Sequence, residues 1–408
     1  MTVIRFLLDG LREMFRGPRE YWMWLGALSV VIIFGAWNYS QQLMHGLVVT
    51  GMSDQVSWGF YISNFAFLVG IAAAAVLLVI PAYIFDRKDI KDVVLVGEGM
   101  AVAAVTMAIL FVIADLGRPD RLWHMLPFLG RFNWPVSLLA WDVLVLSVYL
   151  LLNLAIPFYV LFSHYRGKEP NIRLYFPFVV VAMFWAISIH TVTAFLFSAN
   201  PARPFWHTSL LGPRFIASAF ASGPALIILT LQIVRKVTSY HISQSVIDTL
   251  ALIMTTALQI SLFFVGAELF TDFYNEGAHA ASIHYLFFGL GGFASLRTWI
   301  WLALILNLIA VVILMIHPMR RKTLYLNIAC VLTFIGIWIE KGMGLVIPGF
   351  IPTPLGEIFE YMPTSVELSV AAGIWAFGIL VFTLLAKAVI AIKQGKIRQA
   401  PKDLTYTQ

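Results

Sequence analysis

The sequence has little charge and almost no cysteine. Only 12% of its 408 residues are charged and 60% are hydrophobic, whereas about a quarter of the residues are charged in an ordinary soluble domain. Cys330 is the single cysteine. It therefore excludes a disulfide framework and any four-cysteine iron–sulfur cluster held by this chain alone. We expect a chain that lies in a lipid bilayer.

Histidines are also poorly placed for a membrane haem, which normally needs paired axial histidines within the membrane. Of nine histidines, only His190 falls deep inside an apolar segment. The others fall at segment ends or in loops: His45, His124, His164, His207, His241, His279, His284 and His317. A haem is therefore not expected, and no metal site is predicted. The net charge of +6 is dispersed over short loops, so nucleic-acid binding has no support.

Ten apolar segments dominate the chain, and they are too long and too continuous for the alternating strands of a barrel. The fold class is therefore predicted to be an all-α polytopic membrane protein of about ten transmembrane helices. The first segment is too long for a signal-peptide core, so we expect a retained helix. The segments are 21–44, 57–85, 93–116, 134–163, 174–198, 211–234, 245–271, 298–316, 323–347 and 366–392.

Positive charge predicts the orientation, because loops on the cytoplasmic side retain lysine and arginine. We count 19 such residues on one side of the predicted layout and six on the other, Arg118, Arg121, Arg131, Arg203, Arg214 and Arg297. The predicted protein is thus a multi-pass protein of the cytoplasmic (inner) membrane with both termini inside. It divides into a segment 1–20, a transmembrane domain 21–392 and a tail 393–408. The second to fifth and sixth to ninth helices are compatible with two four-helix bundles, flanked by two peripheral helices.

Polar residues inside the segments are candidate functional groups, because each ionisable one costs about 2.5 to 3.5 kcal/mol to insert. At about 1.5 Å of rise per residue, Asn64, Asp142 and His190 lie roughly 10 to 12 Å inward from the outer side. Asp115, Glu268 and Glu340 fall near the outer helix ends, whereas Glu98 falls near an inner end. Asp115 and Glu268 are equally compatible with helix-end charges, and Asn64 with a link between helices. Asp142 and His190 cannot reach water from that depth, which favours function.

The loop after the third segment contains charges of both signs. It reads Asp115-Leu116-Gly117-Arg118-Pro119-Asp120-Arg121-Leu122-Trp123-His124. Arginine on the outer side runs against the topology rule, and mixed charge is typical of a pairing or docking surface. An ordinary charged loop with an interfacial tryptophan is the alternative. The outer aromatics Trp58, Tyr61, Trp134 and Trp141 are typical of an interfacial belt.

The motif Asp-Leu-Gly-Arg-Pro at 115–119, the run Ser57-Trp58-Gly59-Phe60-Tyr61 with Asn64 beyond it, and the ten-segment layout carry a resemblance. In these features the whole chain resembles the NrfD/PsrC family of quinone-interacting membrane subunits. Residues 58–65, followed by Leu68-Val69-Gly70 and an alanine run, are most similar to the DsrP branch. That branch belongs to DsrMKJOP complexes of sulfur-metabolising, sulfate-reducing microbes, and has a relative in the Hme complex.

The resemblance implies a subunit without a redox centre of its own. It implies a menaquinone near the outer face, beneath a ferredoxin-like iron–sulfur subunit, with other membrane and cytochrome subunits as further partners. Asp115 and Arg118 fall on the motif of the family. Asn64, Asp142 and His190 are added from depth and chemistry, and the predicted quinone pocket is Asn64, Arg118, His124, Trp134, Asp142 and His190. Predicted proton transfer uses His190, Asp142 and Asp115, and a proton path adds Glu98, Glu268 and Glu340.

Two other functions use the same features. A secondary transporter or ion channel would use the intramembrane carboxylates to carry its substrate, although no obvious pair of broken helices is apparent in the sequence. A passive anchor for other subunits would leave His190 and Asp142 unexplained.

Overall fold

The computed structural model describes residues 2–126, 128–275, 277 and 280–398. His279, one of the nine histidines, lies outside the described residues, as does the end of the predicted tail. Within those ranges the protein is helical and has no strand, only an isolated bridge between Leu290 and Phe293. The all-α prediction is confirmed.

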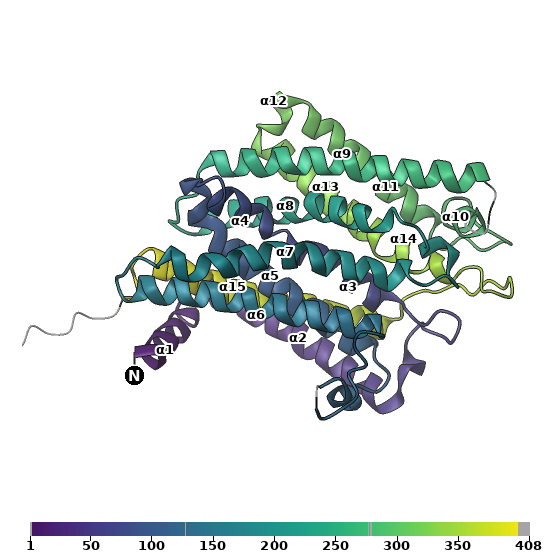
Figure 1. Ribbon diagram of the computed structural model, residues 1–408, viewed down its shortest axis with the longest axis horizontal. Helices are drawn as coiled ribbons and strands as arrows, with labels where there is room; N and C mark the ends of the chain where they lie inside the picture. Colours follow the sequence, from purple (N-terminus) through teal and green to yellow (C-terminus); the bar gives the residue numbers. More distant parts are fainter. Residues whose placement is uncertain (1, 127, 276, 278–279, 399–408) are drawn as a thin grey trace, which may run out of the picture.

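Ten helices in the described chain are long and apolar enough to cross a membrane. Each predicted segment matches one of them to within a few residues (Figure 1). The second crossing is made of two helices, α3 and α4. The crossings are α2 (Arg19–His45), α3 (Phe60–Ala73) with α4 (Val76–Tyr83), α5 (Lys88–Asp115), α6 (Leu138–Tyr165), α7 (Ile172–Ser198), α8 (Leu211–Val237), α9 (Gln244–Asn275), α11 (Arg297–Met315), α13 (Thr323–Lys341) and α15 (Ser365–Lys393).

Shorter helices lie in the connections. The α-helical ones are α1 (Thr2–Met14), α10 (Ala280–Phe287), α12 (His317–Arg320) and α14 (Met343–Val346). Four 3₁₀ helices are η1 (Leu47–Val49), η2 (Pro119–Met125), η3 (Pro204–Trp206) and η4 (Pro348–Phe350). Following the predicted orientation, the end of the bundle that holds η2 is called the outer end below, and the end that holds α1 the inner end.

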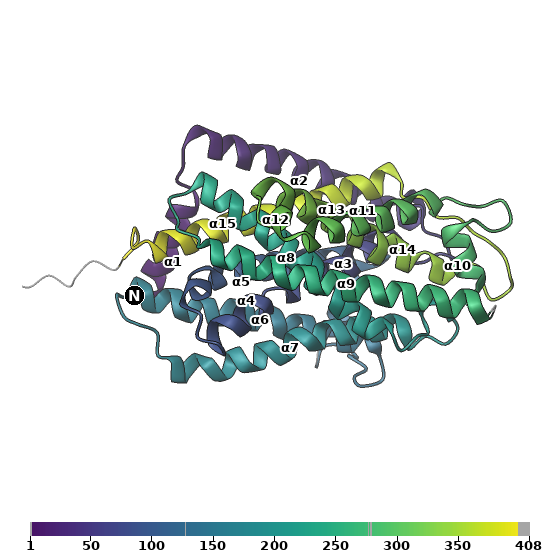
Figure 2. The same cartoon turned by 90° about the horizontal axis from the view of Figure 1, so that it is seen from above.

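The long helices run side by side in two groups (Figures 1 and 2). In the first group α3 packs on α5 and α7, and α6 packs on α5 and α7. In the second, α8 packs on α9 and α13, while α11 packs on α13 and α9. Contacts of α8 with α3 and α7 join the groups, and α2 and α15 pair with each other at the periphery. This arrangement agrees with the predicted division.

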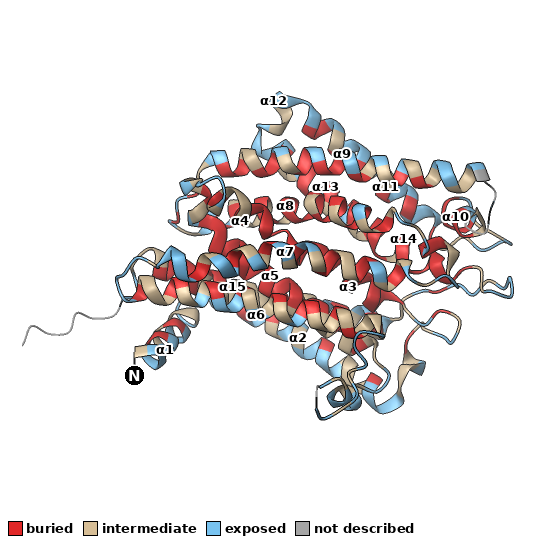
Figure 3. Ribbon diagram, viewed as in Figure 1, coloured by how far each residue is buried: buried red, intermediate tan, exposed pale blue. Residues whose placement is uncertain are grey.

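Burial follows this layout. The crossing Phe60–Tyr83 and helix α5 are buried along most of their length, whereas α2 and α15 expose much of their surface (Figure 3). Glycines bring α2 and α15 together: a Cβ built on Gly35 would lie 2.7 Å from Gly373 Cα. Small residues allow such close backbone approach between membrane helices.

The second crossing is interrupted near its middle, which the sequence pattern does not show. Ala74 and Ala75 form a turn between α3 and α4, and the Ala74 amide donates to the carbonyl of Ile71, three residues back. Pro81 follows inside α4 and cannot donate a helical hydrogen bond. A Cβ on Gly223 of α8 would overlap Ala74, so α8 passes close to the break. The ninth crossing, Thr323–Phe350, is interrupted as well, because α13 ends at Lys341 and α14 begins at Met343 after Gly342.

The N-terminal segment forms a helix of its own. Phe6 of α1 is buried against Phe158, Phe162 and Tyr165 of α6. The Tyr165 hydroxyl donates to Asp9 at 2.7 Å. This contact holds α1 against the inner end of the bundle, beside the last turns of α15 (Figure 1).

Candidate functional site

An arginine inside the bundle bridges two carboxylates. The guanidinium of Arg214 on α8 forms ion pairs with Glu268 of α9 and Glu340 of α13, and its Nε lies 3.0 Å from Glu340 Oε1. All three side chains are buried. The pairing offsets the cost of placing each charge in a low-dielectric interior. Glu268 and Glu340, predicted as parts of a proton path, therefore share one cation.

Lys341 follows Glu340 in the sequence and is buried as well. Its Nζ lies 3.4 Å from the carbonyl oxygen of Phe215 and 4.1 Å from the centroid of the Phe215 ring. A cation over an aromatic face is stabilised by the quadrupole of the ring. Arg214 and Lys341 carry two positive charges, and Glu268 and Glu340 carry two negative ones. We call these four residues the charge quartet; their formal charges sum to zero.

The quartet corrects the charge count behind the predicted orientation. Arg214 was counted with the outer side chains, but it lies in the first turn of α8 with its side chain buried in ion pairs. The count also omits Lys341 and Lys387, which lie inside predicted segments. The rule that an ionisable residue within a span is a functional candidate would have found Arg214 and Lys341. Their partners were not visible, because they come from helices far apart in the sequence.

Asp142 and His190 are buried on the neighbouring helices α6 and α7. Thr193 donates its hydroxyl to Asp142 Oδ1 at 2.7 Å. His190 Nδ1 lies 3.3 Å from the carbonyl oxygen of Ala186, while its Nε2 is buried without a hydrogen-bond partner in the described chain. Buried polar atoms are rarely left unpaired. The free Nε2 is thus an atom that a ligand or water could satisfy.

Asn64 links three helices. Its side-chain oxygen accepts hydrogen bonds from the indoles of Trp338 on α13, at 3.1 Å, and Trp375 on α15, at 2.9 Å. Its amide nitrogen donates to the carbonyl of Phe60 at 2.8 Å. Both acceptor sites of the oxygen are thereby used. Asn64 acts as an interhelical link in this structure, the alternative that the sequence left open.

Asp115 ends α5 at the outer end of the bundle. Its Oδ1 is buried without a hydrogen-bond partner among the described residues. Beside it, Gln42 of α2 donates to the carbonyl of Ala114 at 2.6 Å and accepts from the Tyr61 hydroxyl at 2.8 Å. These bonds fix the end of α5. Asp115 therefore presents one unsatisfied carboxyl oxygen from a rigid support.

The Glu367 carboxylate interacts electrostatically with the side chain of Asp115. It is fully buried at the start of α15, where Thr364 and Glu367 form a capping box. Glu367 accepts from the backbone amides of Gly51 at 2.7 Å and Thr364 at 2.9 Å, and from the Tyr361 hydroxyl. Sequence reasoning missed this residue, although Thr-x-x-Glu before an apolar run is a recognisable helix-start signal.

The outer loop 116–137 is mostly exposed. Arg118 and Asp120 pair with each other, Nε to Oδ1 at 3.0 Å, and the Arg118 guanidinium holds the pKa of Asp120 below its ordinary value. The His124 ring lies 3.9 Å from the Trp123 ring at a tilt of 42°, and Trp134 packs on Trp141. Several large apolar side chains here are exposed: Trp123, Leu126, Phe128, Leu129, Trp134 and Val136. Arg118, His124 and Trp134 thus lie at the surface, apart from the buried groups.

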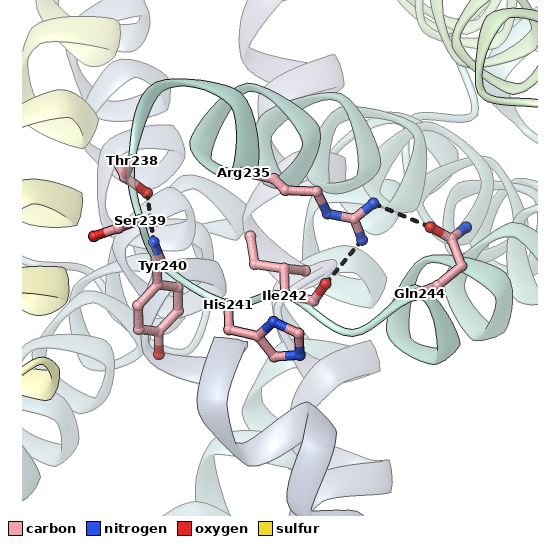
Figure 4. A pocket seen from close by; sticks show the side chains of 7 residues that line it. All are labelled: Arg235, Thr238, Ser239, Tyr240, His241, Ile242 and Gln244. Atoms are coloured by element: carbon pink, nitrogen blue, oxygen red, sulfur yellow. Dashed lines mark hydrogen bonds between the residues drawn. The ribbon is translucent and has the colours of Figure 1, made fainter.

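Glu98 lies at a distance from these groups, in the inner half of α5. It lines a small cavity of about 10 Å³. A larger cavity of about 410 Å³ lies at the inner end in the turn between α8 and α9, lined by Arg235, Thr238, Ser239, Tyr240, His241, Ile242 and Gln244 (Figure 4). In this cavity, the Arg235 guanidinium donates hydrogen bonds to the side-chain oxygen of Gln244 and to the carbonyl of Ile242. The residues predicted for a quinone pocket line neither cavity.

Metal ligands do not gather in the described ranges, where no group of three or more histidine, cysteine, aspartate or glutamate side chains could hold an ion. What the structure does bring together are buried groups able to hold or pass protons. His190 is influenced by the charge of Lys341, which connects the α6–α7 pair to the quartet. The arrangement can bind a polar ligand and exchange protons with it.

Comparison with protein families gives a match to the family described as "Polysulphide reductase, NrfD", over residues 48–352. This range contains both interrupted crossings, the outer loop and the charge quartet.

Three relatives that match along most of their length carry informative names. The "Hdr-like menaquinol oxidoreductase integral membrane subunit" of Archaeoglobus fulgidus is 24% identical, covering 94% of this chain and 97% of its own. A selenate reductase subunit of Mesobacillus selenatarsenatis is 24% identical over 92% of this chain and 96% of its own. The "Menaquinone reductase, integral membrane subunit" of Nitratidesulfovibrio vulgaris is 22% identical over 90% of each.

Proposed function

Because this chain belongs to the polysulphide reductase NrfD family, we propose that it is the quinone-interacting membrane subunit of a multi-subunit redox complex. Relatives named for menaquinol oxidation and menaquinone reduction support menaquinone as its quinone. The chain exchanges electrons through an adjacent iron–sulfur subunit on the outer face and handles the protons of the quinone itself. The subunit is not an enzyme alone.

The observation that carries this proposal is that two buried polar atoms of the predicted site, His190 Nε2 and Asp115 Oδ1, have no partner among the described residues; they are two of eight such atoms there. A quinone ring offers oxygens at its opposite ends, which accept or donate a hydrogen bond according to the oxidation state. An imidazole nitrogen and a carboxyl oxygen in an apolar bundle fit such a ligand. When bound, menaquinone would supply the coupled carriage of electrons and protons.

The residues of the chain divide into three roles. His190, Asp142 and Asp115 hold or move protons at the ring, with Thr193 fixing Asp142. Asn64 supports the quinone site by fixing α3, whereas Arg118, His124 and Trp134, predicted for the quinone pocket, are exposed in the outer loop and are assigned to the partner surface. Glu268, Glu340 and Glu98 extend a proton path, in which Arg214 and Lys341 set the charge balance.

The outer loop 116–137 is the proposed surface for the iron–sulfur partner. It combines exposed apolar side chains with Arg118, Asp120, Arg121 and Arg131. Exposed apolar groups rimmed by charge are typical of protein interfaces. Further membrane and cytochrome subunits of a DsrMKJOP-like complex in the inner membrane complete the proposed assembly. The cytoplasmic segment 1–20 and the tail 393–408 flank its transmembrane domain 21–392.

A secondary transporter or ion channel is the second candidate, and one observation favours it. The turn at Ala74 and Ala75 interrupts a crossing in mid-membrane, as discontinuous helices do in transporters. The family match, however, favours a redox complex.

Two conservative variants test the proposal. His190→Gln keeps hydrogen-bonding capacity without titration near neutrality, and Asp142→Asn does the same for the carboxylate. In the assembled complex, both variants should retain quinone and lose most quinol-linked electron transfer across a range of pH. His164→Gln is the matched control, because that imidazole also bonds a carbonyl four residues back but lies at the inner end of α6. Near-normal turnover in both test variants would refute the proton role.

A further inference from the structure

Glu98 is the buried carboxyl group that the outer site does not use. It lies on α5 with 4% of its surface exposed, and its Oε2 has no hydrogen-bond partner among the described residues. The side chain lines a cavity of about 10 Å³ between α4, α5, α6 and α7. Apolar groups such as Val76 and Met183 form most of the wall, and Tyr149 and Asn153 of α6 contribute to it as well.

The cavity lies against the break in the second crossing, since Ala75 and Val76 form part of its wall. The Tyr149 hydroxyl donates to the carbonyl of Ala72 at 3.1 Å, next to the break. Asn153 in turn donates to the carbonyl of Tyr149 at 2.9 Å. Two polar side chains of α6 are thereby fixed beside Glu98. The interruption of the helix and the orphaned carboxyl group share one small space.

An ionised carboxylate here would be unusually costly. No lysine or arginine of the described chain forms an ion pair with Glu98, in contrast to Glu268 and Glu340. An unpaired charge in an apolar interior is disfavoured strongly enough that such a group takes up a proton instead. A cavity of about 10 to 15 Å³ on this measure is the least that holds one water molecule. The cavity beside Glu98 thus has room for one water molecule. Its apolar surroundings favour the protonated, neutral form of the carboxyl group.

Tyrosines connect this cavity to the inner end. The rings of Tyr83 on α4 and Tyr175 on α7 pack edge to face, with their centroids 5.9 Å apart. Tyr159 follows at 6.0 Å from Tyr175, and its hydroxyl accepts from the amide of Asn171 in the loop before α7. Three titratable groups interact electrostatically with Glu98: Tyr83, Tyr149 and Tyr175. The phenols form a series from the loop towards the carboxyl group.

We propose that Glu98 and one water molecule form a proton-binding site, which exchanges protons with the inner side through Tyr83 and Tyr175. A proton from the tyrosine side passes through the water to one carboxyl oxygen, and the proton of the other oxygen returns through the same water to the tyrosine side, so that each group keeps its charge. The exchange needs no redox partner. The inference rests on the proposed function, in which Glu98 extends the proton path, but the exchange itself does not require bound quinone.

Infrared spectroscopy of the purified full-length protein in lipid nanodiscs tests this directly. At neutral pH, the wild-type spectrum minus the Glu98→Gln spectrum should contain the carbonyl band of a protonated carboxylic acid, which identifies the band of Glu98. Glu20→Gln, which removes an exposed carboxylate of α2, should keep the band. On transfer to D₂O the band should shift, and Tyr175→Phe should slow that shift. Asn153→Leu, which fills the cavity, should keep the band and slow the shift as well.

Two results would overturn the site. One is a spectrum in which Glu98→Gln removes an ionised carboxylate band in place of the acid band. The other is loss of the acid band when choline chloride is replaced by sodium chloride, which would identify a sodium site. If Glu98→Gln does not fold, an unchanged exchange rate in both Tyr175→Phe and Asn153→Leu refutes the route. None of these spectra depends on bound quinone, so failure here and failure of the proposed function are distinguishable.

Discussion

Replacing Arg214 with glutamine should destabilise the bundle through charge alone. Arg214, Glu268, Glu340 and Lys341 sum to zero, so Arg214→Gln leaves the quartet at −1 with Glu268 and Glu340 facing no guanidinium. Removing one partner of a buried ion pair typically costs about 3 to 5 kcal/mol, because the remaining charge stays buried. We expect a loss of this size in the free energy of unfolding.

A second substitution separates charge from shape. Arg214→Gln combined with Glu268→Gln returns the quartet to zero, and it should recover at least half of the loss. The assay is unfolding of the detergent-solubilised protein, monitored by tryptophan fluorescence or by retention of the monodisperse peak after heating. Arg297→Gln is the matched control, because that side chain is exposed at the start of α11. A single variant within about 1 kcal/mol of wild type, or a double variant no more stable than the single one, would refute the reasoning.

Three further predictions address packing, docking and cofactors. Gly373→Ala should destabilise the α2–α15 pair by about 1 to 3 kcal/mol, because the added Cβ would lie 2.9 Å from Gly35 Cα. Gly26→Ala is the control, because a Cβ there would meet nothing within 4 Å. Equal unfolding midpoints for the two variants would contradict this prediction. Arg118→Ala should weaken co-purification with the iron–sulfur partner while the helices insert normally. In the wild type that association should persist above the lowered pKa of Asp120 and decline as the pH falls through it; unchanged co-purification would return the loop to an ordinary charged surface. The isolated chain should show no haem absorption and no stoichiometric iron, by visible spectroscopy and metal analysis, and either one would overturn the partner-dependent mechanism.

The helices could be read from the sequence because the bilayer makes length and apolar content nearly sufficient. A run such as 366–392 must satisfy its own backbone hydrogen bonds, and α15 occupies nearly the same residues. The break at Ala74 and Ala75 could not be read, because it lies in an alanine run with neither glycine nor proline at the turn. It is recognisable only when α6 and α8 are packed against it.

The sequence identified several of the buried candidate residues, but it could not show which residues they contact. Depth identified Asp142, His190 and Glu98 as costly groups, and all three are buried. Depth could not show that Asn64 is used by two indoles, since Trp338 and Trp375 come from helices far along the chain. Arg214 illustrates the same limit: a cation near a helix end looks like a loop charge until its two carboxylates are in place.

The quinone content of the purified complex tests the central claim most directly. Lipids extracted from the complex that contains this chain should yield about one menaquinone per chain. The complex that carries both His190→Ala and Asp115→Ala should retain less, because two of the buried polar atoms without partners are removed. A complex that turns over quinol yet holds no quinone attributable to this chain, with the double variant indistinguishable from wild type, would contradict the account.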